Sequence, residues 1–180
     1  RTEMMDEATL ALIPQVLAWP RMRVLVVDDG SPDGTGELVR QLAADEPRIS
    51  LLARPRKQGL GPAYLAGCRR ALAEGAEFIF EMDADFSHDP SYLPALLAAA
   101  EQGCDLVLGS RYVRGGGTVN WGLLRQLISR SGNTYARAIL GLPVMDATGG
   151  FRCYRRRVLE AIDLNAIHSN GYSFQVELVY

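Results

Sequence analysis

The chain has 180 residues, of which 48% are hydrophobic and 22% are charged, and its formal net charge is −2. This length and balance suit one globular domain with a sizeable core, so residues 1–180 are treated as a single domain. The composition lacks the strong basic excess typical of nucleic-acid binders, and the apolar run LPALLAAA is far shorter than the roughly 18 to 20 residues that span a bilayer. Three widely spaced cysteines without a C-x-x-C pair predict reduced thiols in a cytoplasmic protein rather than a zinc site.

Strand and helix patterns alternate along the chain. Residues 1–18 read as a helix, and the β-branched run RVLVVDDGS that follows is typical of a strand buried on both faces of a parallel sheet. Further strands are predicted at 49–54, 77–83 and 105–111, and helices at 34–47, 59–75, 89–103 and from 171 onward. This alternation with short connections predicts a three-layer, Rossmann-like α/β fold with a mostly parallel central sheet.

Polar residues follow three of the predicted strands. They are DDGS at 28–31, DAD at 83–85 and GSR at 109–111. In such sheets ligands bind at the carboxyl ends of the strands. The sequence therefore predicts an active site at one edge of the sheet.

Asp83 and Asp85 are candidate metal ligands. Residues two apart in extended backbone face the same way, so both carboxylates can converge on one object, and they repel each other unless a cation lies between them. Hard oxygen ligands suit Mg²⁺ or Mn²⁺. The alternative is a polar strand end with Asp85 in a solvated loop. Asp89, which precedes Pro90, is predicted to be a helix N-cap.

Asp28, Asp29 and Gly59 are candidate nucleotide contacts. A carboxylate at a strand tip can accept hydrogen bonds from ribose hydroxyls or a base N–H, although S-P-D-G is also a strong turn signature. We interpret residues 31–34 as a turn and one of the two aspartates as a ligand group. Gly59 opens a helix, whose free N–H groups suit an anionic or polar ligand.

A basic segment follows the fourth strand. It contains four arginines within 20 residues, which could clamp phosphates: Arg111, Arg114, Arg125 and Arg130. After a glycine triplet, a predicted helix has these apolar positions: Trp121, Leu124, Leu127, Ile128, Tyr135, Ile139 and Leu140. Arg125 and Ser129 are four residues apart and share a face of this helix. Two alternatives remain, a solvated amphipathic helix with arginines at its edges and a basic helix lying on an anionic membrane surface.

Several of these stretches occur together in a recognisable order. VLVVDDGSPDGT, GLGPAYLAG, EMDADFSHDP, GSRYVRGGG, NWGLLRQLISRSGNTYAR, DATGGFRCYRR and GYSFQVEL resemble the polyprenol (dolichol) phosphate mannose synthases, which are inverting GT-A glycosyltransferases of family two. The similarity runs from about Val24 to Glu177. DDGS with DAD alone would indicate only family two, and the block from 109 onward narrows this to transfer onto a polyprenyl phosphate.

The resemblance implies transfer of mannose from GDP-mannose to a polyprenyl (dolichyl) monophosphate with Mg²⁺ or Mn²⁺ as cofactor. It implies nucleotide binding by Asp28, Asp29, Gly59 and Asp83. It implies metal binding by Asp83, Asp85 and Ser87. Arg111, Arg125 and Ser129 match positions that engage the acceptor phosphate, and the expected catalytic residues are Asp85, Arg111 and Arg125.

The resemblance also indicates what this chain lacks. The family begins with a strand and a Pro-Thr-Tyr-Asn-Glu-like stretch, and it continues into a basic acceptor loop. Nothing here matches either part, so we expect a GT-A catalytic domain without its first strand and C-terminal segment. The family implies a protein peripheral on the cytoplasmic face of the membrane, in some cases with a membrane-spanning partner domain or subunit.

Three other functions compete with this interpretation. The first is transfer of glucose or another sugar from a UDP-sugar to the same lipid phosphate. The second is a catalytically silent nucleotide-sugar-binding subunit, which would not need Asp83, Asp85, Arg111 and Arg125 together. The third is nucleic-acid binding through the arginines, which the acidic strand ends oppose by repelling phosphates.

Overall fold

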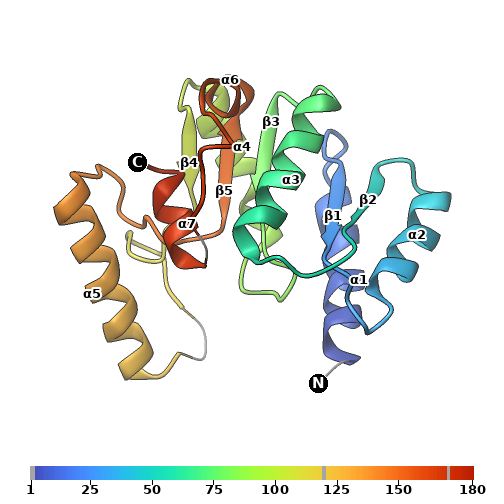
Figure 1. The fold of residues 1–180 in the computed structure, drawn as a ribbon, viewed down its shortest axis with the longest axis horizontal. Coiled ribbons are helices and arrows are strands. Elements are labelled where there is room, and N and C mark those ends of the chain that lie inside the picture. The colour runs from blue at the N-terminus through green and yellow to red at the C-terminus, as the bar shows by residue number, and fades with distance from the viewer. Residues whose placement is uncertain (1–2, 119–120, 170) are drawn as a thin grey trace.

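The computed structural model describes residues 3–118, 121–169 and 171–180 (Figure 1). Residues 1 and 2 of the predicted first helix, and residues 119 and 120 of the basic segment, lie outside the described residues. The helices are α1 (Glu3–Leu17), α2 (Thr35–Asp45), α3 (Leu60–Ala73), the 3-10 helix η1 (Pro90–Tyr92), α4 (Leu93–Glu101), α5 (Leu123–Leu140), α6 (Arg156–Ala161) and α7 (Tyr172–Glu177). The strands are β1 (Val24–Asp28), β2 (Ile49–Ala53), β3 (Phe78–Glu81), β4 (Leu106–Leu108) and β5 (Arg152–Arg155).

The five strands of the described part of the chain form two sheets. β1 and β2 are parallel, in a register that pairs Val24 with Ile49 and Asp28 with Ala53. In the second sheet β5 lies between β3 and β4 and is antiparallel to both. β3 and β4 therefore run in the same direction, so the strands that follow the helical crossovers keep the orientation expected of an α/β fold.

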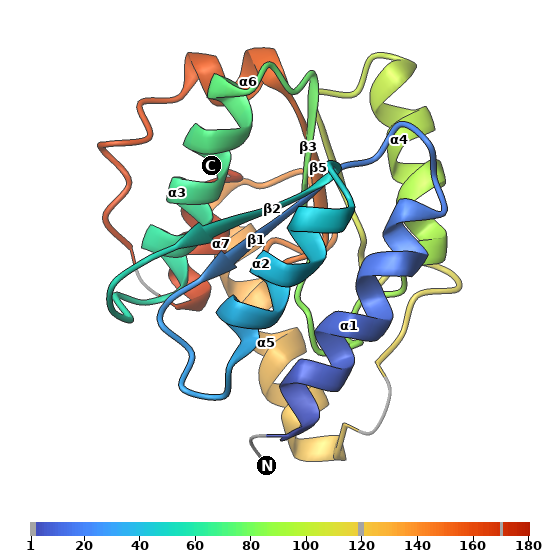
Figure 2. The same cartoon turned by 90° about the vertical axis from the view of Figure 1, so that its right-hand side faces the viewer.

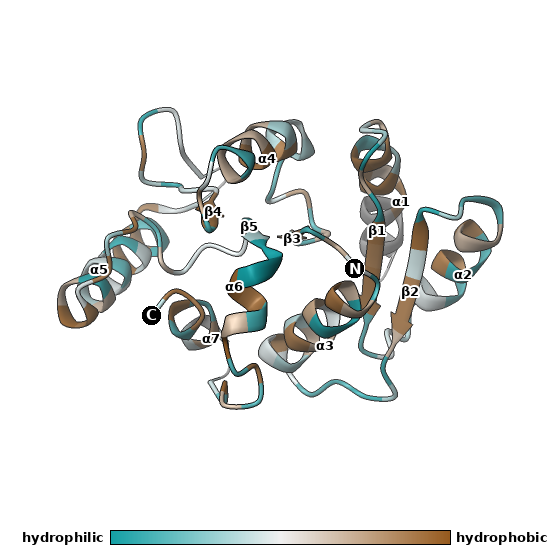
Figure 3. Ribbon diagram, turned by 90° about the horizontal axis from the view of Figure 1, so that it is seen from above, coloured by the Kyte–Doolittle hydropathy of each residue, from teal (hydrophilic) through white to brown (hydrophobic). Residues whose placement is uncertain are grey.

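Helices cover both faces of the strands, which confirms the predicted three-layer α/β architecture (Figures 1 and 3). On one face, α1, α2 and α4 supply apolar side chains such as Ile13, Val39 and Leu96. On the other, α3, α6 and α7 pack Leu65, Leu159 and Phe174 against β3, β4 and β5. The strands therefore lie between two layers of helices, as continuous β-branched runs predict.

Two short elements were not predicted from the sequence. β5 carries an arginine at each end, and α6 follows it directly. Four residues of this composition have weak intrinsic strand preference, and they become a strand because β3 and β4 pair with them on both sides. The Arg152 side chain is fully enclosed and donates to the carbonyls of Gly149 and Ala147.

Helix α5 stands to one side of the sheet (Figure 1). Among its residues only Asn133 is buried, and its side-chain amide binds the Met145 carbonyl at 2.8 Å and the Ala147 N–H at 2.9 Å. The apolar stripe along the helix is exposed: Leu123, Leu124, Leu127, Ile128, Tyr135, Ile139 and Leu140. Trp121, predicted as a helical position, precedes α5.

Among the helices of the described part of the chain, none combines the length and hydropathy needed to cross a membrane.

Candidate active site

The acidic stretch after β3 forms a bend rather than a strand end. The predicted strand at 77–83 stops at Glu81, so Asp83 and Asp85 do not share one face of an extended strand, and that premise was wrong. The physical reason is a competing acceptor: the Asp83 N–H donates to Nδ1 of His88 at 3.0 Å. The loop that follows contains Phe86 at φ +60°, a conformation that is uncommon for a bulky residue.

Each of the two carboxylates has one oxygen engaged. Oδ1 of Asp83 accepts from the Tyr64 hydroxyl at 2.6 Å, and Oδ1 of Asp85 accepts from the Ser87 N–H at 2.9 Å. Within the described residues, the second oxygen of each carboxylate accepts no hydrogen bond. Partial burial raises the pKa of Asp85, but the hydrogen bonds from Ser87 outweigh it and hold the pKa below its usual range. This carboxylate is therefore ionised at neutral pH.

These residues fit part of the shell of a hard divalent cation. Two carboxylate oxygens on one loop suit Mg²⁺ or Mn²⁺, which also accept waters and phosphate oxygens as ligands. Among the described residues no group of three or more histidine, cysteine, aspartate or glutamate side chains could hold a metal. A cation here would depend on the substrate for further ligands. Ser87 is exposed, and its N–H is directed to Asp85.

His88 belongs to this site, although it was not among the residues predicted to form it. Its ring stacks on Phe151 with the centroids 5.1 Å apart. Because Nδ1 accepts the Asp83 N–H, the neutral ring carries its proton on Nε2. Burial lowers the pKa of His88, with Asp83 and Asp85 opposing and Arg111 reinforcing that shift. In the sequence, only the short distance from His88 to the D-x-D stretch could have indicated that His88 belongs to this site.

The predicted nucleotide contacts lie at the tip of β1 and the start of α3. Asp28 is buried and accepts from the Ser31 N–H at 3.0 Å, which confirms the predicted turn. Asp29 forms an ion pair with Arg54 at 2.7 Å. Gly59 precedes α3 at φ +105°, a backbone conformation that favours glycine. Their role in nucleotide binding stays a prediction.

Arg111 is held by a buried carboxylate. Its Nε and Nη2 donate to the two carboxylate oxygens of Asp146, at 2.7 Å each, and Nη2 also reaches the Thr148 hydroxyl at 2.7 Å. Asp146 is fully buried. Burial raises the pKa of Asp146, but the Arg111 hydrogen bonds and charge hold it below its usual range. The charge of Arg111 is therefore fixed in place by a bidentate pair.

The other predicted acceptor residues gather around two aromatic rings. The Arg125 guanidinium lies 4.1 Å from the centroid of Trp121, and Arg111 lies 5.5 Å from the same ring. Ser129 shares a 2.6 Å hydrogen bond with the Tyr112 hydroxyl. The structure thus brings together the three residues that the sequence singled out here. Tyr112 had not been predicted to take part.

The loop at 146–150 joins the acidic and basic groups. Its first residue, Asp146, binds Arg111, and its last, Gly150, approaches the acidic bend. A Cβ on Gly150 would lie 3.6 Å from Oδ2 of Asp83, 3.6 Å from Cε1 of His88 and 3.7 Å from Nε2 of Gln175. Gln175 is buried, and its Oε1 has no hydrogen-bond partner among the described residues. The groups that follow β3 and β4 are therefore connected through this loop, and the placement of Asp28 and Asp29 in the same site stays a prediction.

Comparisons with known proteins place this site in a family. The model of "Glycosyl transferase family 2" matches residues 1–163. The chain belongs to glycosyl transferase family 2. It is 51% identical over 164 residues to a polyprenol monophosphomannose synthase of Mycolicibacterium smegmatis, covering 91% of this chain and 62% of that protein. It is 51% identical over 163 residues to an undecaprenyl-phosphate mannosyltransferase of Micrococcus luteus, covering 91% and 67%. The chain thus spans about two thirds of these curated relatives.

A solved structure shares the fold. The crystal structure of glucosyl-3-phosphoglycerate synthase from Mycobacterium tuberculosis in complex with Mn²⁺ and UDP-glucose has a TM-score of 0.57 and 22% identity, covering 86% of this chain and 51% of that one. At this identity the likeness concerns the fold alone, and it supports the predicted GT-A fold.

Proposed function

We propose that this chain is the catalytic part of an inverting glycosyltransferase that moves mannose from GDP-mannose to a polyprenyl monophosphate. The observation that carries the proposal is that the loop at 146–150 contacts both the acidic bend and the aromatic-basic cluster. The acidic bend holds Asp83 and Asp85, and the aromatic-basic cluster consists of Arg111, Tyr112, Trp121, Arg125 and Ser129. A reaction between a sugar diphosphate and a lipid phosphate needs both groups of side chains, the acidic one and the basic one. The names of the two relatives at 51% identity, a polyprenol monophosphomannose synthase and an undecaprenyl-phosphate mannosyltransferase, support the choice of sugar and acceptor.

The chemistry needs little acid–base assistance. The acceptor phosphate is already an anion, so its oxygen attacks the anomeric carbon of the donor sugar without a general base. The bond from that carbon to the diphosphate breaks as the new C–O bond forms on the opposite face, so the configuration inverts. GDP departs with the electron pair, and no proton is transferred. The barrier that the protein must lower is the repulsion between the two phosphate groups.

We assign the charges of the site accordingly. Arg125 is exposed on the Trp121 ring and would bind the acceptor phosphate, with Ser129 beside it. Arg111, fixed by Asp146, would supply positive charge between the two substrates.

Asp83 and Asp85, with Ser87 as a third candidate ligand, would hold Mg²⁺ or Mn²⁺, and Asp28, Asp29 and Gly59 would lie beside the nucleotide. A bound cation supplies charge stabilisation for the departing diphosphate.

The exposed stripe of α5 would rest on the membrane that contains the lipid acceptor. Leu124 and Leu127 are 70% and 64% exposed, and Arg125 lies between them in the sequence. Apolar side chains beside arginines are typical of helices that lie in the interface of an anionic bilayer. The three cysteines are free thiols, which supports the cytoplasmic face of that membrane.

The test is an activity assay with the full-length protein. Purified protein is incubated with polyprenyl phosphate, Mg²⁺ or Mn²⁺, and either labelled GDP-mannose or labelled UDP-glucose. We expect a lipid-linked product from GDP-mannose only. A product from UDP-glucose alone would overturn the choice of donor and favour the rival transferase. Nucleotide-sugar binding without any product would favour the silent binding subunit.

A further inference from the structure

Gln175, on α7, has a buried side-chain amide whose acceptor group the protein leaves unused. The side chain is 2% exposed, and its Oε1 accepts no hydrogen bond from the described residues. A buried polar group without a partner destabilises a fold, and such groups are rare in proteins. An apolar side chain at this position would therefore serve the fold better, and the amide needs another explanation.

The position of Gln175 is fixed by its neighbour in the helix. Phe174 is fully buried, and its ring stacks on Tyr64 of α3 with the centroids 6.1 Å apart. A Cβ on Gly61 would lie 2.9 Å from the Phe174 ring, so α3 and α7 are in close contact here. The Tyr64 hydroxyl donates to Asp83 at 2.6 Å. The Tyr64 side chain thus places α7 relative to the acidic bend.

The Gln175 amide borders a small space beside Gly150. A Cβ on Gly150 would lie 3.7 Å from Nε2 of Gln175 and 3.6 Å from Oδ2 of Asp83. It would also lie 3.6 Å from Cε1 of His88. These separations are ordinary van der Waals contacts, so the space accepts a small group. Side chains from the acidic bend and from α7 therefore meet around it.

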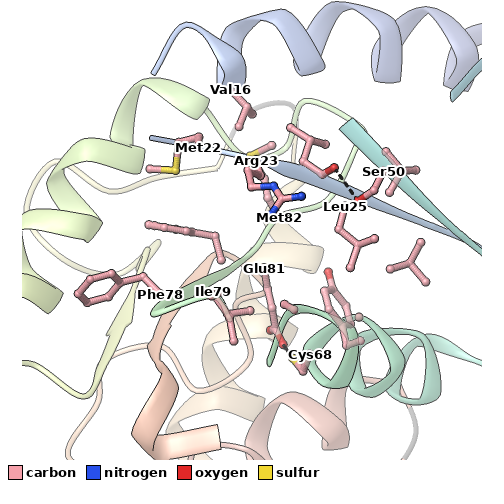
Figure 4. Close-up of a pocket in the computed structure, with 18 of the residues that line it drawn as sticks. Val16, Met22, Arg23, Leu25, Ser50, Cys68, Phe78, Ile79, Glu81 and Met82 are labelled. Atoms are coloured by element: carbon pink, nitrogen blue, oxygen red, sulfur yellow. Dashed lines mark hydrogen bonds between the residues drawn. The ribbon is translucent and has the colours of Figure 1, made fainter. Parts of the chain in front are cut away.

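The other buried carboxylate nearby does not pair with Gln175. Glu81, the last residue of β3, faces the pocket drawn in Figure 4. One of its oxygens contacts Sγ of Cys68 at 3.8 Å, and the other contacts the Tyr154 hydroxyl at 3.5 Å (Figure 4). Both oxygens of Glu81 are thus engaged by other groups, which leaves the Gln175 amide for a ligand.

The space beside Gly150 lies where a donor sugar has to be. On one side is the Asp83 carboxylate, which is assigned to the metal-bound diphosphate. On the other, Gly150 belongs to the loop whose Asp146 holds Arg111. The acceptor phosphate attacks the anomeric carbon opposite the departing diphosphate, so the sugar must lie between the two phosphate groups.

A hydroxyl group matches this amide better than a phosphate does. A glutamine side chain carries a donor and an acceptor, and its last torsion angle is soft, so either group can turn toward the space. A hydroxyl accepts from Nε2 or donates to Oε1. A phosphate only accepts, and it would also face the negative charge of Asp83.

We propose that Gln175 binds a hydroxyl group of the donor sugar and so contributes to the selection of that sugar. This inference rests on the proposed function, because it requires a nucleotide sugar at the acidic bend. A nucleotide without the sugar leaves the amide unpaired, whereas the nucleotide sugar supplies its partner. Sites with buried polar groups discriminate strongly against ligands that leave those groups unpaired.

Calorimetric binding of GDP-mannose and of GDP to the full-length protein, with Mn²⁺ present, tests the proposal. Gln175→Met keeps the length of the side chain and removes the amide. We expect its affinity for GDP-mannose to fall about 3- to 10-fold, the effect of losing one hydrogen bond, and its affinity for GDP to stay the same. An unchanged affinity for GDP-mannose, or an equal loss for GDP, would overturn the proposal.

Gly150→Ala tests the location of the sugar independently. The added methyl group fills the space without a contact shorter than 3.6 Å, so the fold should be kept. We expect the affinity for GDP-mannose to fall about tenfold or more and the affinity for GDP to be kept. If GDP-mannose binds this variant as it binds the wild-type protein, the sugar lies elsewhere and the proposal is wrong.

Urea unfolding separates a ligand contact from a structural role. Gln175→Met should unfold at the same or a higher urea concentration than the wild-type protein, because it removes an unpaired amide. The contrasting variant is Asn133→Leu. The Asn133 amide has two partners, the Met145 carbonyl and the Ala147 N–H, so its loss should lower the urea midpoint. A lower midpoint for Gln175→Met would mean that the amide supports the fold, against the proposal.

The choice of donor can fail without affecting this inference. If the wild-type protein binds UDP-glucose and not GDP-mannose, the proposed donor is wrong, and the same variants are compared with UDP-glucose and UDP. If a nucleotide sugar binds and no product forms, only the transfer reaction is refuted. The role of Gln175 depends solely on the difference in affinity between the nucleotide sugar and the nucleotide.

Discussion

Arg111 binds both carboxylate oxygens of Asp146, at 2.7 Å each, and this pair connects the end of the β4 segment to the loop at 146–150. Asp146 is fully buried, whereas the Arg111 side chain is 21% exposed. The pair lies between the acidic bend and the aromatic-basic cluster. Its loss would therefore affect both the stability of the fold and the placement of Arg111.

We expect Asp146→Asn to lower the free energy of unfolding by about 3 kcal/mol, because it leaves the partly buried Arg111 without its counter-charge. The matched control is Asp105→Asn, which removes an exposed ion pair with Arg157 at 2.6 Å and should cost less than about 1 kcal/mol. Urea unfolding of both variants measures the difference. Equal losses would contradict a structural role for the Arg111–Asp146 pair.

Glu81 should make this chain less stable as the pH rises. Burial raises the pKa of Glu81 to about 7, against the opposing effect of Arg152. Between the pKa of the unfolded chain, near 4.5, and about 7, the folded state therefore holds a proton that the unfolded state has lost. The stability it contributes is complete below the unfolded pKa and falls with rising pH across this window, by up to about 3 kcal/mol.

Unfolding measurements from pH 4.5 to 7.5 check this prediction. Glu81→Gln should flatten the pH dependence, since glutamine does not titrate. Glu101→Gln is the control, because Glu101 is an exposed partner of Arg21 and should leave the slope unchanged. An unaltered slope in Glu81→Gln would exclude Glu81 as its cause.

Asp85→Asn should abolish metal-dependent turnover and weaken Mn²⁺ binding in the presence of GDP at least tenfold. The same stretch offers a control in Asp89→Asn, because each aspartate accepts a hydrogen bond from the N–H two residues onward, Ser87 or Ser91, at 2.9 and 2.8 Å. Asp89 caps η1, so its change should affect stability by about 1 kcal/mol or less and leave turnover intact. Similar Mn²⁺ affinities in the two variants would argue against the metal role of Asp85.

Arg125→Ala should reduce kcat/KM for the polyprenyl phosphate by about 10- to 100-fold, the effect of removing a hydrogen bond to a charged group. GDP affinity should change little, because Arg125 is assigned to the acceptor. Arg40→Ala is the control. Arg40 is an exposed arginine that pairs with Glu37 on α2, away from the aromatic-basic cluster. Loss of GDP binding without loss of acceptor use would refute the assignment.

Leu124→Glu should weaken binding to vesicles of anionic phospholipid by at least tenfold, since one buried leucine contributes about 1.5 to 3 kcal/mol. Leu10→Glu changes an exposed leucine of α1, which lies on the opposite side of the molecule from α5 in Figure 1 and in front of α5 in the view of Figure 2, and should not affect vesicle binding. Co-sedimentation with vesicles measures both. If the two variants bind equally, the α5 stripe is not the membrane surface.

Local patterns were sufficient to predict the layers and the regular elements other than β5 and α6. The β-branched run at β1 and the periodic apolar residues of α2 and α3 predict their structures directly, since burial on both faces requires such runs. The predicted ends of the elements were less accurate. In β3, for example, the His88 side chain accepts a hydrogen bond from the N–H of Asp83. Sequence spacing does not reveal such a competing hydrogen bond.

The sequence by itself determined the three-layer fold and the position of Asp83 and Arg111 after β3 and β4, which end at the same edge because they run in the same direction. Only the tertiary structure decided which groups meet there. Asp146 and Arg111 are 35 residues apart, and His88 faces Gly150 across the sheet edge. Contacts of this kind depend on how loops close over the strands, and neither residue type nor periodicity encodes that closure.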